Sequence, residues 1–345
     1  MIKFGKTSST LLSQKQSFFD NNDEILAESK RIGNVYLSQP RRRACKCCDK
    51  PLDGKKFTKH SIGYIICDVC THLNGMFEDT DEFCRSLYTD YGGASYAVNY
   101  SAEDHSQFQE RVKHIYLPKA QFLFDSLKNL NEAAENMKMA DFGAGSGYFV
   151  TALRMEGIKN SNGYEVSDTQ IRLANEMLGQ GAVIKHEMNE TVDIAKNIDA
   201  EVVTMVGVLE HLQNPRDVLA ALASNPNVNY LFISVPLFSP CVIIESVFPN
   251  VMQRQLSSGH THLYTEKSLE WMRGEFGLES VSEWWFGTDI VDLFRSVSVE
   301  LNHNSQISEL GEFWNESIIA SIDEMQMSLD KRKMSSEVHM LMKFV

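Results

Sequence analysis

The stretch Met139-Ala-Asp-Phe-Gly-Ala-Gly-Ser-Gly-Tyr148 decides the fold of this chain. It predicts a short strand that ends in an acid, then three glycines at alternate positions, then a helix that begins at Tyr148. Because glycine has no Cβ, a ligand can approach the backbone closely and φ can be positive. The unpaired amides at the start of the following helix point toward whatever binds there. The stretch therefore predicts a turn that cradles a nucleotide-like ligand, and a glycine-rich turn without any ligand is the alternative.

The spacing of the glycines separates two classes of ligand. A dinucleotide fingerprint would place its third glycine three residues after Gly145, where Tyr148 stands instead. The stretch resembles motif I of the class I methyltransferases, D-x-G-x-G-x-G, filled by Asp141, Gly143, Gly145 and Gly147. The resemblance implies that these residues bind S-adenosylmethionine, a cation that carries no pyrophosphate. A dinucleotide-dependent oxidoreductase is the rival class, and the position of the third glycine disfavours it.

The bulk composition excludes several kinds of partner. The chain has 345 residues, a hydrophobic fraction of 43% and a formal net charge of −13, so one large domain or two can form a sizeable core. An acidic chain is a poor match for a phosphate backbone, which disfavours nucleic acid as a partner. No apolar run is long enough to span a bilayer, and the first residues lack the apolar core of a signal peptide. The expected compartment is therefore the cytoplasm, with no membrane partner.

Strands and helices alternate after residue 137, which predicts a mostly parallel sheet. Glu165 lies near the end of the second strand, 22 residues beyond Gly143. An acid at about this distance is the expected ribose ligand, since a carboxylate accepts protons from both hydroxyls. The resemblance implies that the loop after the third strand contacts the adenine, through Met188 and Asn189. Many family members have an acid in this loop, so this chain departs from the pattern there.

The fourth strand ends in Glu210-His211, within a V-L-E-H-L-x-x-P sequence that resembles small-molecule methyltransferases acting on sugars and quinones. Ligands bind outside the carboxyl ends of strands in open α/β sheets, which places both residues beside the methyl donor. An imidazole with an ordinary pKa near 6.5 is a reasonable proton acceptor at neutral pH. His211 is therefore a candidate general base, and the alternative is a histidine that holds the loop by hydrogen bonds.

A second histidine-rich loop follows the fifth strand, in the run Gly259-His-Thr-His-Leu-Tyr264-Thr265. This run resembles the corresponding loop of sugar methyltransferases, in which His260 is the matching residue. His260 is thus the second candidate base, and Tyr264 is expected to help shape the acceptor site. His260 and His262 could also be a metal pair, but the sequence shows no third ligand.

Two cysteine pairs precede the sheet. Cys45 and Cys48 form one C-x₂-C pair, Cys67 and Cys70 form the other, and 18 residues separate the pairs. This is the spacing of a zinc ribbon, in which four thiolates surround a structural Zn²⁺ without leaving an open position. Cys47 could replace Cys45 if the first turn is irregular. Reduced thiols without a metal are the alternative.

Tyrosines are crowded between the cysteine pairs and the sheet, at Tyr88, Tyr91 and Tyr96. A tyrosine ring offers a flat apolar face and a hydroxyl, which suits a sugar or another ring as ligand. A packing segment between domains explains the same crowding equally well. One or two helices are expected over residues 108–127, with a break at Pro118.

The whole chain resembles methyltransferases that have an N-terminal zinc-binding domain, most closely the deoxysugar C-methyltransferases. The expected fold is α/β, a Rossmann-like seven-stranded methyltransferase domain with a small N-terminal zinc-ribbon-like domain. The expected lead-in, residues 1–40, is weakly ordered and can include one short amphipathic helix around residues 23–32. A zinc-binding domain is expected over residues 41–85, and a tyrosine-rich and helical linker over residues 86–130. The methyltransferase domain, residues 131–345, is expected to have insertions after the fifth and sixth strands, with the sixth strand at 278–287 and a last edge strand at 336–345.

The resemblance implies methyl transfer from S-adenosylmethionine to a small polar acceptor, most closely a nucleotide-linked sugar held between the two domains. Glu210, His211 and His260 are the candidate catalytic residues, with one histidine as the base. Both C- and O-methylation are compatible with this pattern. The alternatives are an O-methyltransferase acting on another small molecule and a non-catalytic protein that binds S-adenosylmethionine.

Overall fold

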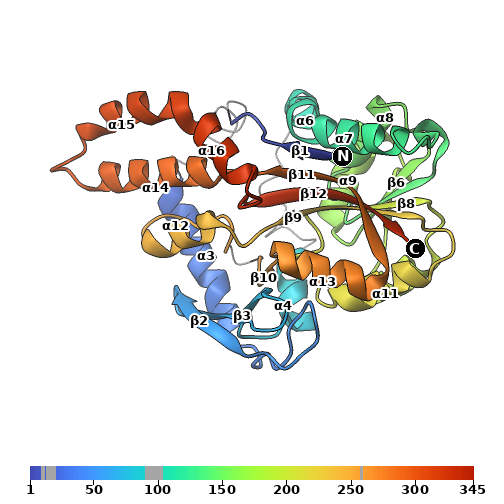
Figure 1. The fold of residues 1–345 in the computed structure, drawn as a ribbon, viewed down its shortest axis with the longest axis horizontal. Helices are drawn as coiled ribbons and strands as arrows, with labels where there is room; N and C mark the ends of the chain where they lie inside the picture. Colours follow the sequence, from blue (N-terminus) through green and yellow to red (C-terminus); the bar gives the residue numbers. More distant parts are fainter. Residues whose placement is uncertain (9–11, 13–20, 90–103, 257–258) are drawn as a thin grey trace.

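The computed structural model describes residues 1–8, 12, 21–89, 104–256 and 259–345 (Figure 1). Within these residues the strand–helix alternation forms a mixed sheet of eight strands in the order β1-β11-β12-β9-β8-β5-β6-β7. Strands β7, β6, β5, β8 and β9 are parallel, and β12 is antiparallel to both β9 and β11. The bounds of the eight strands are Ile2–Phe4, Leu278–Phe286, Glu337–Phe344, Tyr230–Pro236, Val202–Val206, Met139–Phe142, Ser161–Glu165 and Val183–Lys185, in sheet order.

The sheet corrects three expectations from the sequence. It has eight strands and not seven, because β1 pairs in parallel with β11. Residues 1–40, expected as a weakly ordered lead-in, contain this strand and the helix α3 (Asn22–Leu37), which includes and extends the short helix expected around residues 23–32. The last strand, β12, lies between β9 and β11 and not at the edge. Its residues 338–342 are all buried, as is typical of a strand covered on both faces.

Helices cover both faces of the sheet, and each layer has its own core (Figure 1). On one face, aromatic residues of α6, α7 and α8 pack on Phe232, Trp284 and Leu341 of the strands. On the other face, aliphatic residues of α10, α11 and α13 pack on the same sheet. The bounds of these helices are His105–Arg111, Leu117–Lys128, Tyr148–Met155, Thr191–Asn197, Pro215–Ser224 and Glu266–Phe276, and α9 spans Asp168–Leu178.

The helical segment before the sheet is continuous where the sequence predicts a break. A π-helical turn, Val112–Tyr116, joins α6 to α7, and the amide of Leu117 donates to the carbonyl of Val112. Pro118 lies in the first turn of α7. Because proline has no N–H to donate, the wider turn accommodates it without ending the helix.

The cysteine-rich segment contributes three strands to a second, smaller sheet of four strands. Its strand order is β10-β4-β3-β2. Strand β10 comes from the loop after β9 and pairs antiparallel with β4, so the histidine-rich loop completes the cysteine-containing sheet. The helix α4 (Asp81–Tyr88) leads from this sheet back toward the large one. The strands span His262–Leu263, Leu73–Gly75, Ile62–Cys67 and Gly54–Lys59, in sheet order.

Four further helices lie after β9. Helix α12 (Pro240–Val247) contacts α14 (Asp289–His303). Figure 1 shows α14, α15 (Leu310–Ile318) and α16 (Ile322–Asp330) extending from one end of the molecule. Among the described residues, no helix combines the length and the apolar character that a bilayer span requires.

Candidate active site and cysteine cluster

A cavity of about 620 Å³ lies at the carboxyl ends of β5, β6, β8 and β9. This is the edge of an open parallel sheet at which ligands bind. Ten of the residues singled out from the sequence line the cavity: Tyr88, Asp141, Gly143, Gly145, Glu165, Met188, Asn189, Glu210, His211 and His260. Residues from helix α4, from strands β5 and β6, and from the segments after β7, β8 and β9 therefore meet in one space.

The glycine turn has the backbone conformation that only glycine adopts easily. The φ angles of Gly143, Gly145 and Gly147 are +74°, +55° and +81°. A Cβ on Gly145 would lie 2.6 Å from Oε1 of Gln170, and one on Gly147 would lie 2.4 Å from a methyl carbon of Leu178. Gly143 and Gly145 line the cavity, whereas Gly147 is not among its described lining residues and allows α8 to pack against α9.

Glu165 connects the turn to the second strand. Its Oε2 accepts a hydrogen bond from the amide of Gly145 at 2.8 Å. Its Oε1 accepts from the amides of Val166 and Ser167 at 2.8 and 2.9 Å. A carboxylate has about four acceptor positions, so the three amides leave room for about one further donor. The side chain thus holds the turn open as well as facing the cavity.

Asp141 lies at the base of the cavity and is almost completely buried. Its Oδ1 accepts a hydrogen bond of 2.6 Å from the hydroxyl of Thr204 on the neighbouring strand. Burial raises the pKa of Asp141 to about 7; the Thr204 hydroxyl opposes this rise, and the nearby Glu165 charge adds to it. The side chain therefore joins β5 to β8 directly beneath the glycine turn.

The cavity lining also holds Glu210, His211 and His260. Nδ1 of His211 lies 3.0 Å from the carbonyl oxygen of Gly259, and Nδ1 of His260 lies 2.9 Å from the carbonyl oxygen of Gln255. A carbonyl only accepts, so each Nδ1 carries the proton and each Nε2 has a lone pair. The two rings lie 4.8 Å apart between centroids.

Burial shifts the pKa values in this cluster. It lowers the pKa of His211 to about 3, with a further decrease from the neighbouring His260, and lowers the pKa of His260 to about 4. Both imidazoles are therefore neutral at pH 7. Burial raises the pKa of Glu210 to about 8. Its Oε2 is buried and has no hydrogen-bond partner among the residues that the structure describes.

The predicted tyrosines have different positions. The hydroxyl of Tyr88 lies 3.0 Å from Nδ1 of His211, so Tyr88 contacts the candidate base as well as lining the cavity. Tyr91 and Tyr96 lie outside the described residues. The expectation for Tyr264 is corrected: it is 1% exposed, is absent from the described lining, and packs edge-on against His72 at 4.6 Å. Its bridge to Leu237 and its position beside β10 direct the ring into the interface between the two sheets.

Several lining residues carry no motif that reveals them. Lys119 and Arg254 bring two cationic side chains to a lining that holds five carboxylates, namely Asp81, Asp141, Glu165, Glu210 and Glu337. Nζ of Lys119 lies 3.5 Å from Glu337, and Arg254 pairs with Asp292 at 2.9 Å. Neither cation belongs to a recognisable sequence motif. Their acidic partners, Glu337 on the last strand and Asp292 on α14, are distant from them in the sequence.

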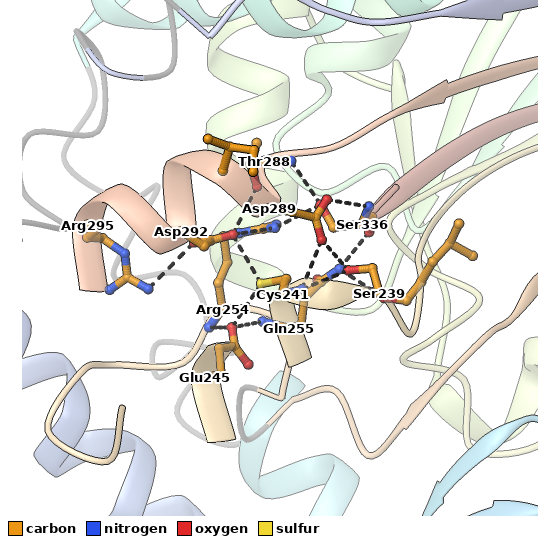
Figure 2. Close-up of polar contacts among 12 residues, drawn as sticks. Ser239, Cys241, Glu245, Arg254, Gln255, Thr288, Asp289, Asp292, Arg295 and Ser336 are labelled. Atoms are coloured by element: carbon orange, nitrogen blue, oxygen red, sulfur yellow. Dashed lines mark hydrogen bonds and ion pairs between the residues drawn. The ribbon is translucent and has the colours of Figure 1, made fainter. Parts of the chain in front are cut away.

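A buried polar network holds the segment that carries Arg254 and Gln255 (Figure 2). The carboxylate of Glu245 accepts hydrogen bonds from the backbone amides of Arg254, Gln255 and Leu256. The side-chain amide of Gln255 donates to the carbonyl oxygen of Ser336 at 2.6 Å. The carbonyl of the same Gln255 fixes the ring of His260, so the network positions a cavity residue. The isolated acid at position 245 of an apolar helix is the one sequence signal that could have indicated it.

The four predicted cysteines lie together, all buried. The Sγ atoms of Cys45 and Cys70 are 3.6 Å apart, those of Cys48 and Cys67 are 3.7 Å apart, and all four lie within 4.8 Å of one another. Zinc–sulfur bonds of about 2.3 Å in a tetrahedron place the sulfurs about 3.8 Å apart. The four thiols therefore have the number, type and spacing of a zinc site. Sγ of Cys47 lies instead 3.3 Å from the carbonyl oxygen of Ser268.

The two cysteine pairs have matching backbone turns. The amide of Asp49 donates to the carbonyl of Cys45, and the amide of Thr71 donates to the carbonyl of Cys67, each at 2.9 Å. Asp49 and Thr71 both have positive φ, of 55° and 61°. Two equivalent turns that present their thiols to one point are what a tetrahedral site requires.

Comparison with known proteins gives a family and several structures with related folds. The profile of the family described as "Methyltransferase domain" matches residues 108–283. No curated protein sequence matches the chain. The chain is similar to magnesium protoporphyrin IX methyltransferase from Synechocystis PCC 6803 with bound SAH, at 12% identity over 77% of this chain and 100% of that one, with a TM-score of 0.46.

Two further solved structures are similar at comparable levels. One is geranyl diphosphate C-methyltransferase from Streptomyces coelicolor A3(2), at 12% identity over 71% of this chain and 85% of that one, with a TM-score of 0.43. The other is a SAM-dependent methyltransferase from Archaeoglobus fulgidus, at 16% identity over 70% of this chain and 100% of that one, with a TM-score of 0.39.

Proposed function

The chain belongs to the methyltransferase domain family, and we propose that it transfers the methyl group of S-adenosylmethionine to a small polar acceptor. The family match covers the glycine turn, Glu165 and Glu210-His211. The observation that carries the proposal is the cavity, whose lining contains both the glycine turn and the Glu210–His211–His260 cluster. A donor held by the turn and an acceptor held by the cluster would share that space.

The donor end offers contacts for each part of S-adenosylmethionine. The amides of the glycine turn suit the carboxylate of the amino-acid part, and the absence of side chains lets the ligand approach the backbone closely. Glu165 has capacity for a ribose hydroxyl, and Met188 and Asn189 line the cavity where the adenine would lie. Acidic side chains in the lining, Glu165 among them, suit a cationic donor, because opposite charges attract in a partly buried site.

For the acceptor we propose a nucleotide-linked sugar, as the family resemblance implies. The carboxylates of the lining repel a diphosphate but accept hydrogen bonds from sugar hydroxyls. The sugar ring would therefore occupy the end near His211 and His260, with the phosphates toward Lys119, Arg254 or the mouth of the cavity. An O-methyltransferase with another small acceptor is the second candidate, because the same cluster can deprotonate a hydroxyl.

The proposed chemistry needs one proton acceptor beside the methyl donor. The sulfonium methyl is attacked in line by a nucleophile, so the protein positions two ligands and removes one proton. His211 and His260 both present an unprotonated Nε2. Their lowered pKa values keep these atoms unprotonated and also make them weaker bases. Tyr88 contacts His211, which assigns Tyr88 a positioning role in addition to its contact with the cavity.

We further propose that Cys45, Cys48, Cys67 and Cys70 bind a structural Zn²⁺. The buried, closed arrangement of four sulfurs leaves no open coordination position for a substrate. When bound, the ion would hold the two turns together and so keep β4 in place to pair with β10. The ion acts on the active site only through this packing.

Incubation of the full chain with labelled S-adenosylmethionine and a panel of acceptors tests the proposed function. The expected result is label transfer to a nucleotide sugar, together with thermal stabilisation by S-adenosylhomocysteine and none by NAD. Stabilisation by S-adenosylhomocysteine without transfer to any acceptor in the panel would favour the non-catalytic binding protein. Stabilisation by NAD alone would overturn the donor assignment.

The substitution Gly145→Ala tests the donor end of the cavity. The φ angle of +55° is strained for alanine, and the added Cβ would lie 2.6 Å from Gln170. We expect the affinity for S-adenosylhomocysteine, measured by calorimetry, to fall by about 10-fold or more, as loss of about 1.4 kcal/mol of binding free energy requires. The matched control is Gly179→Ala, which also has positive φ, +92°, but has open space around the new Cβ. Equal losses in both variants would contradict a specific role for the turn.

A further inference from the structure

The acceptor end of the cavity has the geometry of a cation site. One carboxylate oxygen of Glu210 and one ring nitrogen each of His211 and His260 lie within 4.8 Å of one another. We propose that these three side chains bind a divalent transition-metal ion, which would be separate from the ion of the four cysteines. The inference rests on the proposed function for the reaction that it serves, and it assigns that site a cation and a class of acceptor.

The hydrogen bonds of the two histidines support this assignment. A metal-binding histidine commonly donates its other ring N–H to a backbone carbonyl, which fixes the tautomer and the ring orientation. Both histidines follow this pattern, through the carbonyls of Gly259 and Gln255 at 3.0 and 2.9 Å. The segment that contains Gln255 is in turn held by Glu245 and by the network of Figure 2. Two lone pairs are therefore oriented in advance by rigid backbone.

Glu210 supplies an independent observation. Its side chain is 3% exposed, and Oε2 has no hydrogen-bond partner within the part of the chain that the structure describes. A buried carboxyl oxygen without a partner is costly whether the group is protonated or not, since it has lost its hydration and gained nothing in return. A cation bound between Glu210 and the two histidines would compensate for that loss.

The donor set indicates the kind of ion and acceptor. Two imidazoles and one carboxylate suit Mn²⁺, Fe²⁺ or Zn²⁺ better than Ca²⁺, which prefers oxygen ligands alone. Three protein ligands leave open positions for a substrate. An acceptor with a hydroxyl or carbonyl oxygen at or next to the methylated atom could occupy one, and the ion would lower the pKa of that acceptor. An imidazole that binds the ion at Nε2 cannot also accept a proton there. Whether methyl transfer requires the metal therefore distinguishes a reaction with a histidine base from one assisted by the ion.

Equilibrium dialysis of the full chain against Mn²⁺, followed by metal analysis, tests the inference. Mn²⁺ is the probe because it prefers oxygen and imidazole ligands to thiolates, which separates this site from the four cysteines. The expected result is one Mn²⁺ per chain in the wild type. Loss of a residue that only orients a metal ligand costs about 10- to 100-fold in metal affinity. Glu210→Gln and His260→Asn each remove a ligand itself, so each should weaken Mn²⁺ binding by more than that. His114→Asn, on a half-exposed histidine paired with Glu110, should bind as the wild type does.

The outcomes distinguish this inference from the proposed function. Each variant is also titrated with S-adenosylhomocysteine, which shows that its fold and donor site are intact. No Mn²⁺ or second Zn²⁺ bound at millimolar concentration, or binding that both cluster variants retain, would overturn the inference and leave the methyltransferase proposal standing. If the chain binds the metal at this site but transfers no methyl group, the metal site is supported and the proposed reaction is rejected.

Discussion

Substitution of Cys67 by serine is expected to abolish metal binding by the cysteine cluster and to prevent stable folding of the segment around it. Serine lacks the thiolate that completes the tetrahedron. Structural zinc contributes about 10–16 kcal/mol in small zinc-binding domains, which is comparable to the whole stability of a domain, about 5–15 kcal/mol. Cys67 ends β3, and its backbone amide donates to the carbonyl of His72, just before β4. The loss should therefore extend to β4 and, through it, to β10 and the loop of His260.

Metal analysis and thermal unfolding measure this effect. The wild type should contain one Zn²⁺ that resists dialysis, whereas Cys67→Ser should contain none and unfold at a much lower temperature. Cys47→Ser is the matched control, because Cys47 lies in the turn of Cys45 and Cys48 but points to the carbonyl of Ser268, which a serine hydroxyl can also contact. A Cys67→Ser chain that keeps both its zinc and its unfolding temperature would contradict the proposal. Loss of zinc from Cys47→Ser would reassign the ligand set.

Replacement of His211 or His260 by asparagine is expected to lower kcat by about 100- to 10,000-fold, the range typical of a lost acid–base group. Loss of a ligand to a catalytic cation would lower kcat as well, so the expectation holds for both roles of the cluster. Donor affinity should change little, because the proposed donor contacts come from the glycine turn and Glu165 and from neither histidine. The measurement is steady-state methyl transfer, with S-adenosylhomocysteine affinity determined in parallel. Full turnover in both variants would remove the cluster from the reaction.

His262→Asn is the matched control for the histidine variants. His262 is two residues from His260 but lies on β10, where its Nδ1 is 2.8 Å from Nε2 of His72. It is fully buried and is not among the described residues that line the cavity. We expect its replacement to lower the unfolding temperature, because it removes a partner from a buried imidazole, and to leave kcat near the wild-type value.

Local patterns were sufficient for the donor end of the site. Gly143, Gly145 and Gly147 were recognisable because a positive φ and a missing side chain are properties of single positions in a short turn. Glu165 was recognisable by its distance from that turn, which the length of a βα unit determines. The four cysteines likewise followed from two short turns of equal length. The family match confirms the expected class of enzyme.

Contacts between distant segments were not visible in the same way. Nothing in residues 2–4 shows that they pair with β11, more than 270 positions away. The alternation in the last strand suggested an edge, yet its burial on both faces places it inside the sheet. Tyr264 is four residues after His260 and was expected to help shape the acceptor site. However, β10 pairs with β4, and the tyrosine ring packs between the two sheets.

The amino-acid sequence by itself thus determined the class of enzyme, the glycine turn with its acid partner, and the set of cysteines, because each depends on residue type and short-range spacing. Only the tertiary structure brought Glu210, His211 and His260 within 4.8 Å of one another and left an oxygen of Glu210 without a partner among the described residues. It also revealed Lys119, Arg254 and Glu337 in the lining. The physical reason is that sheet order and buried hydrogen bonds bring these side chains together, and both depend on pairing between segments that no local pattern specifies.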